Sequence, residues 1–221
     1  MIALHLAARS DADMPFVTRL AAVRSSEDGE SFCLSSTPAR SLWCGSHGLF
    51  ELSYAREGLI GDILLVDPGA GRAERLIRAG SRHNSLLVTE QCDQLCLMCS
   101  QPPKKTHRDR FRYFEAACRL AEPGSAIGLT GGEPTLHMEP MLAMLERLLK
   151  DRPDLAFHIL SNGQHFNAGN CERLTGRLRS NIVWGIPLYA ADHSLHDRIV
   201  GKPGAFGRLT ESFAHLLGAG A

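Results

Sequence analysis

The sequence has no excess of charge of either sign. Its 221 residues include 24 Lys and Arg against 24 Asp and Glu, so the formal net charge is zero. Without a net charge, no global field draws the chain to nucleic acid or to an anionic membrane. We therefore expect any partner to be recognised locally, and we predict neither a nucleic acid nor a membrane as that partner.

Long apolar runs, internal repeats and low-complexity tracts are also missing. Every apolar stretch is short and interrupted by charge, and a membrane-spanning helix needs about 20 apolar residues. The N-terminal stretch MIALHLAARSDAD reaches Arg9, Asp11 and Asp13 too early for a signal peptide. The sequence therefore predicts a soluble, cytoplasmic protein.

A secreted disulfide framework is excluded by the number and placement of the cysteines. There are seven, an odd number, and Cys92, Cys96 and Cys99 lie within eight consecutive positions. A reducing compartment favours metal binding for such a group. Three soft ligands on one loop suit a metal that prefers sulfur, but a closed zinc site or an ordinary cubane cluster has four. The missing fourth ligand has to be explained.

The pattern along the chain changes near Ser85. Before it, short apolar runs lie between Gly, Ser and Pro, and residues 61–80 predict two strands joined by a turn at 67–71. The length suits one sizeable core or a small domain attached to a larger one. We predict a small β-rich segment over 1–84 and a second segment over 85–221.

From Ser85 onward, short buried-type strands alternate with amphipathic helical patterns. Because crossover helices connect strands that run parallel, this order predicts a parallel α/β barrel or open sheet. The expected strands are 85–89, 126–130, 155–160 and 181–189. The expected helical stripes are Phe111, Phe114, Cys118 and Ala121; Met141, Met144, Leu145, Leu148 and Leu149; and Leu209, Phe213, Leu216 and Leu217.

Each predicted strand is followed by an unusual loop. The first precedes the three cysteines, the second the sequence TGGEP at 130–134, the third SNG at 161–163 and the fourth IPLY at 186–189. In parallel α/β folds the loops after the strands form one functional rim. We therefore expect all four loops to converge on one site.

The spacing CxxxCxxC after a first strand, with GGEP after a second, resembles the radical S-adenosylmethionine (radical SAM) superfamily. That resemblance implies a 4Fe-4S cluster on three cysteines, whose open iron binds the amino and carboxylate groups of S-adenosylmethionine. An electron passed to the sulfonium then releases methionine and a 5'-deoxyadenosyl radical, which removes hydrogen from a substrate. It also implies a reducing electron donor.

The same resemblance implies a fold and an extent. The chain would contain a partial radical SAM (β/α) barrel, with the first four β/α units preceded by the β-rich segment. Two further units would be needed after Ala221, so the resemblance predicts a chain truncated at its C-terminus.

The resemblance also implies site residues. Cys92, Cys96 and Cys99 would hold the metal cluster. Gly131 and Gly132 would permit close approach of the methionine end of the cofactor, where a Cβ would obstruct it, and Glu133 would accept from its ammonium group.

The remaining cofactor contacts come from three loops. Ser161 and Asn162 would hydrogen-bond the ribose or the methionine carboxylate, and Tyr189 would meet the adenosine. Met98 stands where an aromatic residue is common, and its flexible thioether would pack on the adenine. No catalytic residue beyond the cluster ligands is assigned.

A narrower resemblance lies in LLVTEQCDQLCLMCSQPPK, residues 86–104, which is similar to the His-Xaa-Ser system radical SAM maturases. It implies a ribosomally made precursor peptide with His-Xaa-Ser repeats as substrate and a second radical SAM protein as partner. Residues 196–220 resemble the fourth-strand loop and following helix of many superfamily members.

Other functions remain open at this stage. One is a radical SAM enzyme that acts on a small molecule or activates another enzyme by making a glycyl radical. Another is a noncatalytic iron-sulfur or zinc module that carries electrons or scaffolds a partner. A zinc knuckle or redox thiol group would explain the cysteines alone, but the phased GGEP favours the radical SAM interpretation.

Four other cysteines have simpler interpretations. Cys118 and Cys171 fall on apolar helical stripes, the latter with Leu174 and Leu178, so we predict small core residues. For Cys33 and Cys44 inert thiols are favoured.

Two polar motifs each have a functional and a structural interpretation. For the HxxH of His193 and His196 we favour a polar loop over a metal site, since no third ligand is near. The basic run at 104–112 suits docking of an acidic electron donor or a peptide carboxylate, but a solvated face at the start of a helix is favoured.

Overall fold

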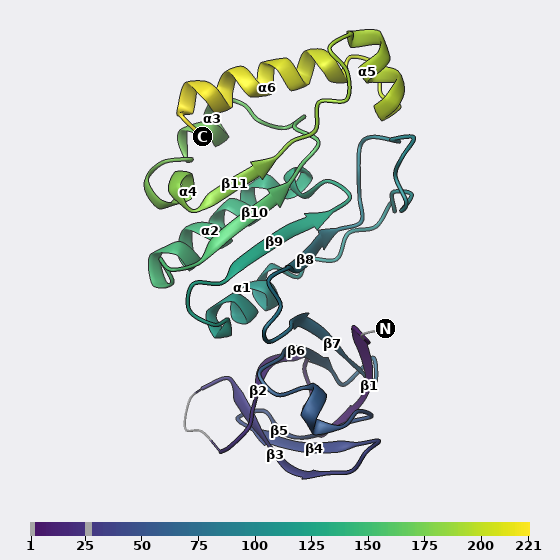
Figure 1. The fold of residues 1–221 in the computed structure, drawn as a ribbon, viewed down its shortest axis with the longest axis vertical. Helices are drawn as coiled ribbons and strands as arrows, with labels where there is room; N and C mark the ends of the chain where they lie inside the picture. The colour runs from purple at the N-terminus through teal and green to yellow at the C-terminus, as the bar shows by residue number, and fades with distance from the viewer. Residues whose placement is uncertain (1–2, 25–27) are drawn as a thin grey trace. The chain divides into compact units, whose positions relative to one another are not determined.

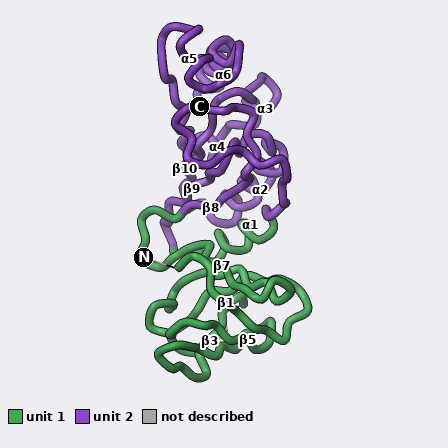
Figure 2. Tube along the Cα trace, turned by 90° about the vertical axis from the view of Figure 1, so that its right-hand side faces the viewer, with its two compact units in different colours: residues 1–84, 112–122 green, residues 85–111, 123–221 purple. Residues whose placement is uncertain are grey.

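The computed structural model describes residues 3–24 and 28–221. The chain divides into two compact units, coloured separately in Figure 2. The first comprises residues 1–84 and 112–122, and the second comprises residues 85–111 and 123–221. Each unit has its own sheet, as Figure 1 shows.

The first unit is built around a closed barrel in the order β1-β5-β4-β3-β2-β6-β7. Closure pairs every strand on both sides, so the barrel presents no free edge for aggregation. Neighbouring strands are antiparallel except for the parallel pair β2 and β3. The strands are β1 (His5–Ser10), β2 (Phe16–Ala21), β3 (Glu30–Ser36), β4 (Ser41–Gly45), β5 (Gly48–Leu52), β6 (Ile63–Asp67) and β7 (Arg72–Ile77), with a short 3-10 helix, η1 (Arg56–Gly58).

Large apolar side chains fill the barrel. Trp43 is fully buried, and its indole Nε1 donates to Ser41 Oγ at 2.8 Å, so its polar group is satisfied within the core. The predicted hairpin is confirmed: β6 and β7 pair antiparallel up to Asp67 and Arg72. Asp67 Oδ1 accepts from Ala70 N at 3.1 Å, which stabilises the turn between them.

A buried ion pair is enclosed in this unit. Arg75 Nε lies 3.2 Å from Asp62 Oδ2, and each side chain is only 3% exposed. Arg75 also donates to Gly58 O at 2.8 Å, and its guanidinium lies 4.9 Å from the centre of the Tyr54 ring. Burial raises the pKa of Asp62, against the lowering effects of the Ala79 amide and of Arg75. The Ala79 amide, Arg75 and Arg78 therefore together favour the charged carboxylate against the effect of burial.

The second unit contains a four-stranded sheet in the order β11-β10-β9-β8. The pairs β9–β10 and β10–β11 are parallel, as the sequence predicts. The strands are β8 (Asn84–Thr89), β9 (Ala126–Gly131), β10 (Ala156–Leu160) and β11 (Ile182–Gly185). The last strand ends four residues before the predicted Tyr189, because Pro187 cannot donate a ladder hydrogen bond and Ile186 before it is restricted.

Helices follow the strands in the predicted order. They are α1 (Phe111–Leu120), which clusters with the first unit, α2 (Met138–Asp151) preceded by the 3-10 helix η2 (Pro134–His137), α3 (Ala168–Glu172), α4 (Gly176–Ser180), α5 (His193–Val200) and α6 (Ala205–Ala219). The predicted stripe of α2 is confirmed, since Met141, Met144, Leu145, Leu148 and Leu149 are all buried.

Two details of the helical prediction are wrong. Cys171, Leu174 and Leu178 are buried, but they lie on two short helices and their connection rather than on one helix. In α6 the buried positions are Ala205, Leu209, Ser212 and Leu216, while Leu217 is 75% exposed. The stripe follows steps of three and four residues, which leaves Leu217 off that face.

The chain is thus a mixed α/β protein with a closed seven-stranded barrel and a separate parallel sheet. The four parallel strands form an open sheet, and their place in a (β/α) barrel stays a prediction. Among residues 3–24 and 28–221, no helix has both the length and the apolar character needed to cross a bilayer.

We predict that the Arg75–Asp62 pair stabilises the barrel because its loss leaves a buried charge unpaired. Arg75→Met should lower the free energy of unfolding by about 3–5 kcal/mol, measured by urea titration. Arg40→Met breaks an exposed pair with Glu51 and should cost less than about 1 kcal/mol. Equal losses in the two variants would contradict a special role for the buried pair.

Candidate functional site

The cysteine loop begins where β8 ends at Thr89. Cys92 and Cys96 are half-buried and Cys99 is exposed, and all three are free thiols. A turn joins the last two, with Cys99 N donating to Cys96 O at 3.0 Å. Cys99 Sγ also contacts Gln101 O at 2.9 Å. The loop therefore presents its thiols just beyond the carboxyl end of a strand, as predicted.

The surroundings of Cys92 and Cys96 disfavour the negative charge of their thiolates. Burial raises the pKa of Cys92, and the nearby Glu133 and Asp93 carboxylates raise it further, against a lowering hydrogen bond from the Gln94 backbone. Burial also raises the pKa of Cys96, followed by the effect of Cys99. A bound metal would supply the positive charge that thiolates need here.

The donor chemistry fits a sulfur-liganded cluster, because three free thiols on one loop influence one another electrostatically. In the part of the chain that is described, no three His, Cys, Asp or Glu side chains are gathered as a metal site. The ligand set Cys92, Cys96 and Cys99 therefore stays a prediction.

The GGEP loop contacts the backbone that leads into the cysteines. Gly132 N donates to Thr89 O at 2.8 Å, and Glu133 N donates to Gln91 O at 2.7 Å. A Cβ on Gly131, whose φ is 144°, would lie 2.0 Å from Thr89 O, and one on Gly132 would lie 2.1 Å from Gln91 O. The need for glycine here thus already follows from the chain's own backbone, whereas the sequence interpretation explained it by the cofactor.

Glu133 is fully buried and satisfied by its own chain. Its Oε1 accepts from Thr135 N at 2.9 Å, from the Thr135 hydroxyl and from Ser161 Oγ at 2.8 Å, while Oε2 accepts from Asn162 N. The carboxylate caps η2 and ties the loop after β9 to the loop after β10. Its contact with an ammonium group stays a prediction.

The loop after β10 is held by its own polar side chains. Ser161 Oγ also accepts from Gly163 N at 3.0 Å, and Asn162 Oδ1 accepts from Gln164 N at 3.1 Å. Asn162 Nδ2 donates to Asp93 Oδ1 at 2.8 Å, which links this loop to the cysteine loop. The structure thus brings three of the four predicted loops into one hydrogen-bonded group.

Asp93 is a site residue that the sequence reasoning missed. Besides Asn162, its carboxylate pairs with Lys202, and its Oδ2 lies 3.3 Å from His165 Nε2. Burial would raise the pKa of Asp93, but the nearby His165 ring and the hydrogen bonds from Lys202 and Asn162 outweigh it and hold the pKa well below its usual range. The only signal in the sequence is an acid directly after Cys92, since Lys202 lies far along the chain.

The fourth predicted loop also reaches the cysteines. Burial raises the pKa of Tyr189, and the Cys96 and Cys99 thiols raise it further, so its hydroxyl lies within their electrostatic range. Apolar side chains around the thiols are exposed: Leu95 by 68%, Leu97 by 78% and Met98 by 53%. The expected adenosine contacts, Tyr189 and Met98, are therefore accessible.

No protein-family model and no curated protein matches this chain. Solved structures do match. One is anSMEcpe, an anaerobic sulfatase-maturating radical SAM enzyme, described as native with bound AdoMet, which is S-adenosylmethionine: TM-score 0.51, 16% identity, 62% of this chain and 41% of that chain. The same enzyme described with bound AdoMet and Kp18Cys peptide matches with TM-score 0.50, 16% identity and the same coverage.

At this identity the likeness concerns the fold alone, and the chain spans about two fifths of the length of anSMEcpe. The match therefore shows a fold shared over that part of the chain. It does not bear on the narrower His-Xaa-Ser family.

The basic run at 104–112 is mostly exposed, as predicted, but only its last two residues, Phe111 and Arg112, belong to a helix. Helix α1 begins only at Phe111, and the residues before it fold back onto the end of β8, where Lys104 N donates to Glu90 O at 2.9 Å. The rings of His107 and His137 stack with centroids 3.6 Å apart. His107 Nδ1 lies 3.1 Å from Thr89 Oγ1, so this stack fastens the run beside the GGEP loop.

The HxxH pair is helical rather than part of a loop. Asp192 caps α5 by accepting from Leu195 N at 2.8 Å, so the helix begins at His193. His196 is 1% exposed and packs against the rings of Tyr189 and Phe206, at 6.0 and 5.7 Å. The His196 ring therefore contributes to the packing around Tyr189.

The other cysteines agree with their simple interpretations. Cys118 and Cys171 are buried. Cys33 and Cys44 are half-buried free thiols. In the register of β3 and β4, Cys33 lies opposite Trp43 and Cys44 lies opposite Phe32, so the two cysteine side chains point to opposite faces of the strands.

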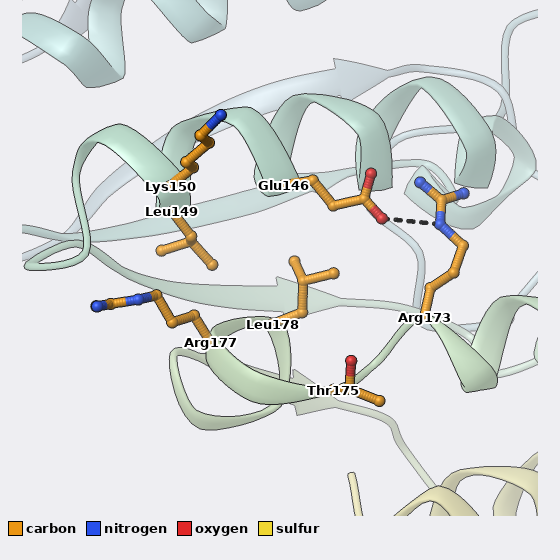
Figure 3. A pocket seen from close by; sticks show the side chains of 7 residues that line it. All are labelled: Glu146, Leu149, Lys150, Arg173, Thr175, Arg177 and Leu178. Atoms are coloured by element: carbon orange, nitrogen blue, oxygen red, sulfur yellow. Dashed lines mark hydrogen bonds and ion pairs between the residues drawn. The ribbon is translucent and has the colours of Figure 1, made fainter.

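A cleft of about 340 Å³ lies elsewhere, lined by α2, α4 and the residues before α4. Figure 3 shows the Lys150 and Arg177 side chains pointing away from each other, and Arg173 turned to Glu146 at 2.9 Å. These residues precede β10 and β11, whereas the cysteine loop follows β8, so the cleft lies toward the other end of the parallel strands. Its cations do not converge on a ligand.

We predict that the GGEP backbone contact tolerates no side chain. Gly132→Ala should destabilise the protein by about 1–3 kcal/mol or more, because its Cβ would overlap Gln91 O. Gly207→Ala is the matched control: it meets nothing within 4 Å on α6 and should be neutral or stabilise by up to about 1 kcal/mol. Thermal unfolding of both variants measures the difference, and an unperturbed Gly132→Ala would refute the close approach.

Proposed function

We propose that this chain belongs to a radical SAM enzyme that cleaves S-adenosylmethionine reductively with a 4Fe-4S cluster. The main support is the hydrogen-bonded group that joins the three-cysteine loop, the GGEP loop and the Ser161–Asn162 loop at the carboxyl ends of the parallel strands. The fold likeness to an AdoMet-bound enzyme adds to it.

In this proposal each loop has a separate task. Cys92, Cys96 and Cys99 hold the cluster, which when bound supplies an electron that cleaves the sulfonium into methionine and a 5'-deoxyadenosyl radical. Ser161 and Asn162 face the polar part of S-adenosylmethionine, and the exposed Tyr189 and Met98 receive the adenosine. These loops also have to exclude water and solvent thiols from the radical.

Glu133 has a more demanding task in this scheme. Its carboxylate already accepts from four donors of its own chain, so an ammonium contact has to replace one of them or add to them. The loop Gly131–Glu133 that it rigidifies is the segment we propose for the methionine end of the cofactor.

The first test concerns the metal. Anaerobic reconstitution should give about four iron and four sulfide per chain with charge-transfer absorption, as for a 4Fe-4S cluster. Replacing Cys92, Cys96 or Cys99 by Ala should abolish iron binding, because three ligands leave none to spare. Cys44→Ala, a half-buried thiol in the barrel, should retain it.

Stoichiometric zinc without iron would refute the cluster and favour the noncatalytic module. A loaded cluster that never cleaves S-adenosylmethionine would leave a noncatalytic iron-sulfur carrier as the better explanation.

For the substrate we propose a ribosomally made peptide with His-Xaa-Ser repeats. The support is the likeness of residues 86–104 to the His-Xaa-Ser system maturases. One matched structure is also described with a bound peptide. The exposed Leu95, Leu97 and Leu188 offer apolar surface near the thiols on which an extended peptide can lie. A generic radical SAM enzyme acting on a small molecule is the second candidate.

The substrate is tested with the full-length enzyme, reductant, S-adenosylmethionine and the repeat peptide under anaerobic conditions. We expect a change in peptide mass and a rise in 5'-deoxyadenosine above the peptide-free background, both lost in Cys96→Ala. Adding the second radical SAM protein covers the case in which both are required. Abundant 5'-deoxyadenosine with an unchanged peptide would reject the maturase and retain the generic enzyme.

A further inference from the structure

The cysteine loop has little structure of its own. Between Thr89 and Phe111 the chain forms neither helix nor strand. A loop of this kind has high conformational entropy, which must be lost if three thiols are to occupy fixed positions. Whatever orders the loop in advance therefore assists the formation of a metal site on it.

The middle of the loop is fastened along one short segment. Leu95 N donates to Val200 O at 3.0 Å, and Leu97 N donates to Ile199 O at 2.9 Å. A Cβ on Gly201 would lie 2.6 Å from Leu95 O, so the two backbones are in close contact. The residues between Cys92 and Cys99 are thus attached to the C-terminal end of α5.

Asp93 lies at the start of this attachment, directly after Cys92. It pairs with Lys202, which lies two residues after Val200, whose carbonyl accepts from Leu95 N. On its other side it accepts from Asn162 and approaches His165, both from the loop after β10. One carboxylate therefore connects three segments that are distant in sequence.

The environment makes this connection stronger than a surface ion pair. The Asp93 and Lys202 side chains are only 21% and 26% exposed, so solvent and salt screen them weakly. For comparison, the Lys104–Glu90 pair at the edge of the same loop is 61% and 41% exposed. The second pair provides a matched control on the same segment.

We propose that Asp93 is a positioning residue that, through Lys202, Asn162 and His165, holds the cysteine loop in place before the cluster assembles. This inference rests on the proposed function for its purpose, since the loop is ordered for metal binding. Asp93 fixes where Cys92 and Asn162 stand relative to each other.

The first experiment uses the metal-free chain and so does not depend on the proposed function. Hydrogen exchange of the Leu95 and Leu97 amides should be about tenfold faster or more in Asp93→Ala and in Lys202→Met, because each loses a charge-assisted hydrogen bond. Lys202→Arg should exchange like the wild type, and Lys104→Met should not change these amides. Unchanged exchange in both Asp93→Ala and Lys202→Met would overturn the proposal.

The second experiment links the loop to metal uptake. At limiting iron and sulfide, Asp93→Ala and Lys202→Met should reconstitute several-fold more slowly than the wild type, with Lys202→Arg restoring the rate. Exchange that accelerates without any change in iron uptake would reduce Asp93 to a purely structural residue and overturn the positioning role.

Failure of the proposed function gives a different result. In that case the wild type itself takes up no iron, while the exchange measurement still reports whether Asp93 holds the loop. A loss of global thermal stability in Asp93→Ala and Lys202→Met that is large enough to explain the faster exchange would indicate general destabilisation and would also count against the proposal.

Discussion

The close approach of two backbones is the constraint on which the site depends. Gly131 and Gly132 lie against the carbonyl groups of Thr89 and Gln91, with hydrogen bonds from Gly132 N and Glu133 N to the same segment. The end of β8 and the end of β9 are thereby brought together at the point where the chain turns into the cysteines. Any side chain at either glycine would push the cysteine loop away from the carboxyl ends of β8 and β9.

Two carboxylates extend this contact to the remaining loops. Glu133 is buried and joins the loop after β9 to the loop after β10 through Thr135, Ser161 and the Asn162 amide. Asp93 joins the latter loop to the cysteines and to the segment after α5. Charge-assisted hydrogen bonds are the stronger kind, and a buried carboxylate without them is costly, so each acid requires its set of donors. Polar networks that are satisfied in this way rigidify a site.

The barrel and the parallel sheet differ in whether their strands have an unpaired edge. The barrel closes on itself and pairs every strand, whereas β11 ends the sheet with Val183 64% exposed. The barrel also contains a buried Arg75–Asp62 pair, which ties β7 to the residue before β6. The chemistry-bearing residues all follow strands of the parallel sheet, in accordance with the general rule for parallel α/β folds.

Several features could be predicted from the sequence because they depend on local order. The spacing of Cys92, Cys96 and Cys99, the alternation of strands and helices after Ser85 and the stripe of α2 are patterns over a few residues. The turn at 67–71 and the glycines of GGEP are likewise visible in the sequence, although the backbone contact that requires the glycines is not. Helical periodicity also predicted Leu217 in the core, because an apolar residue next to Leu216 still fits a helical stripe in the sequence.

Tertiary structure alone decided the contacts between residues that are far apart. Closure of seven strands into a barrel, the burial of His196, and the pairing of Asp93 with Lys202 depend on long-range packing that carries no spacing signal. The sequence by itself determined which chemical groups follow each strand, because strand order and loop composition are local. Which of these groups are exposed, and which, like Glu133, are consumed by the chain's own donors, was decided by the fold, because burial and hydrogen bonding are set by neighbours from other loops.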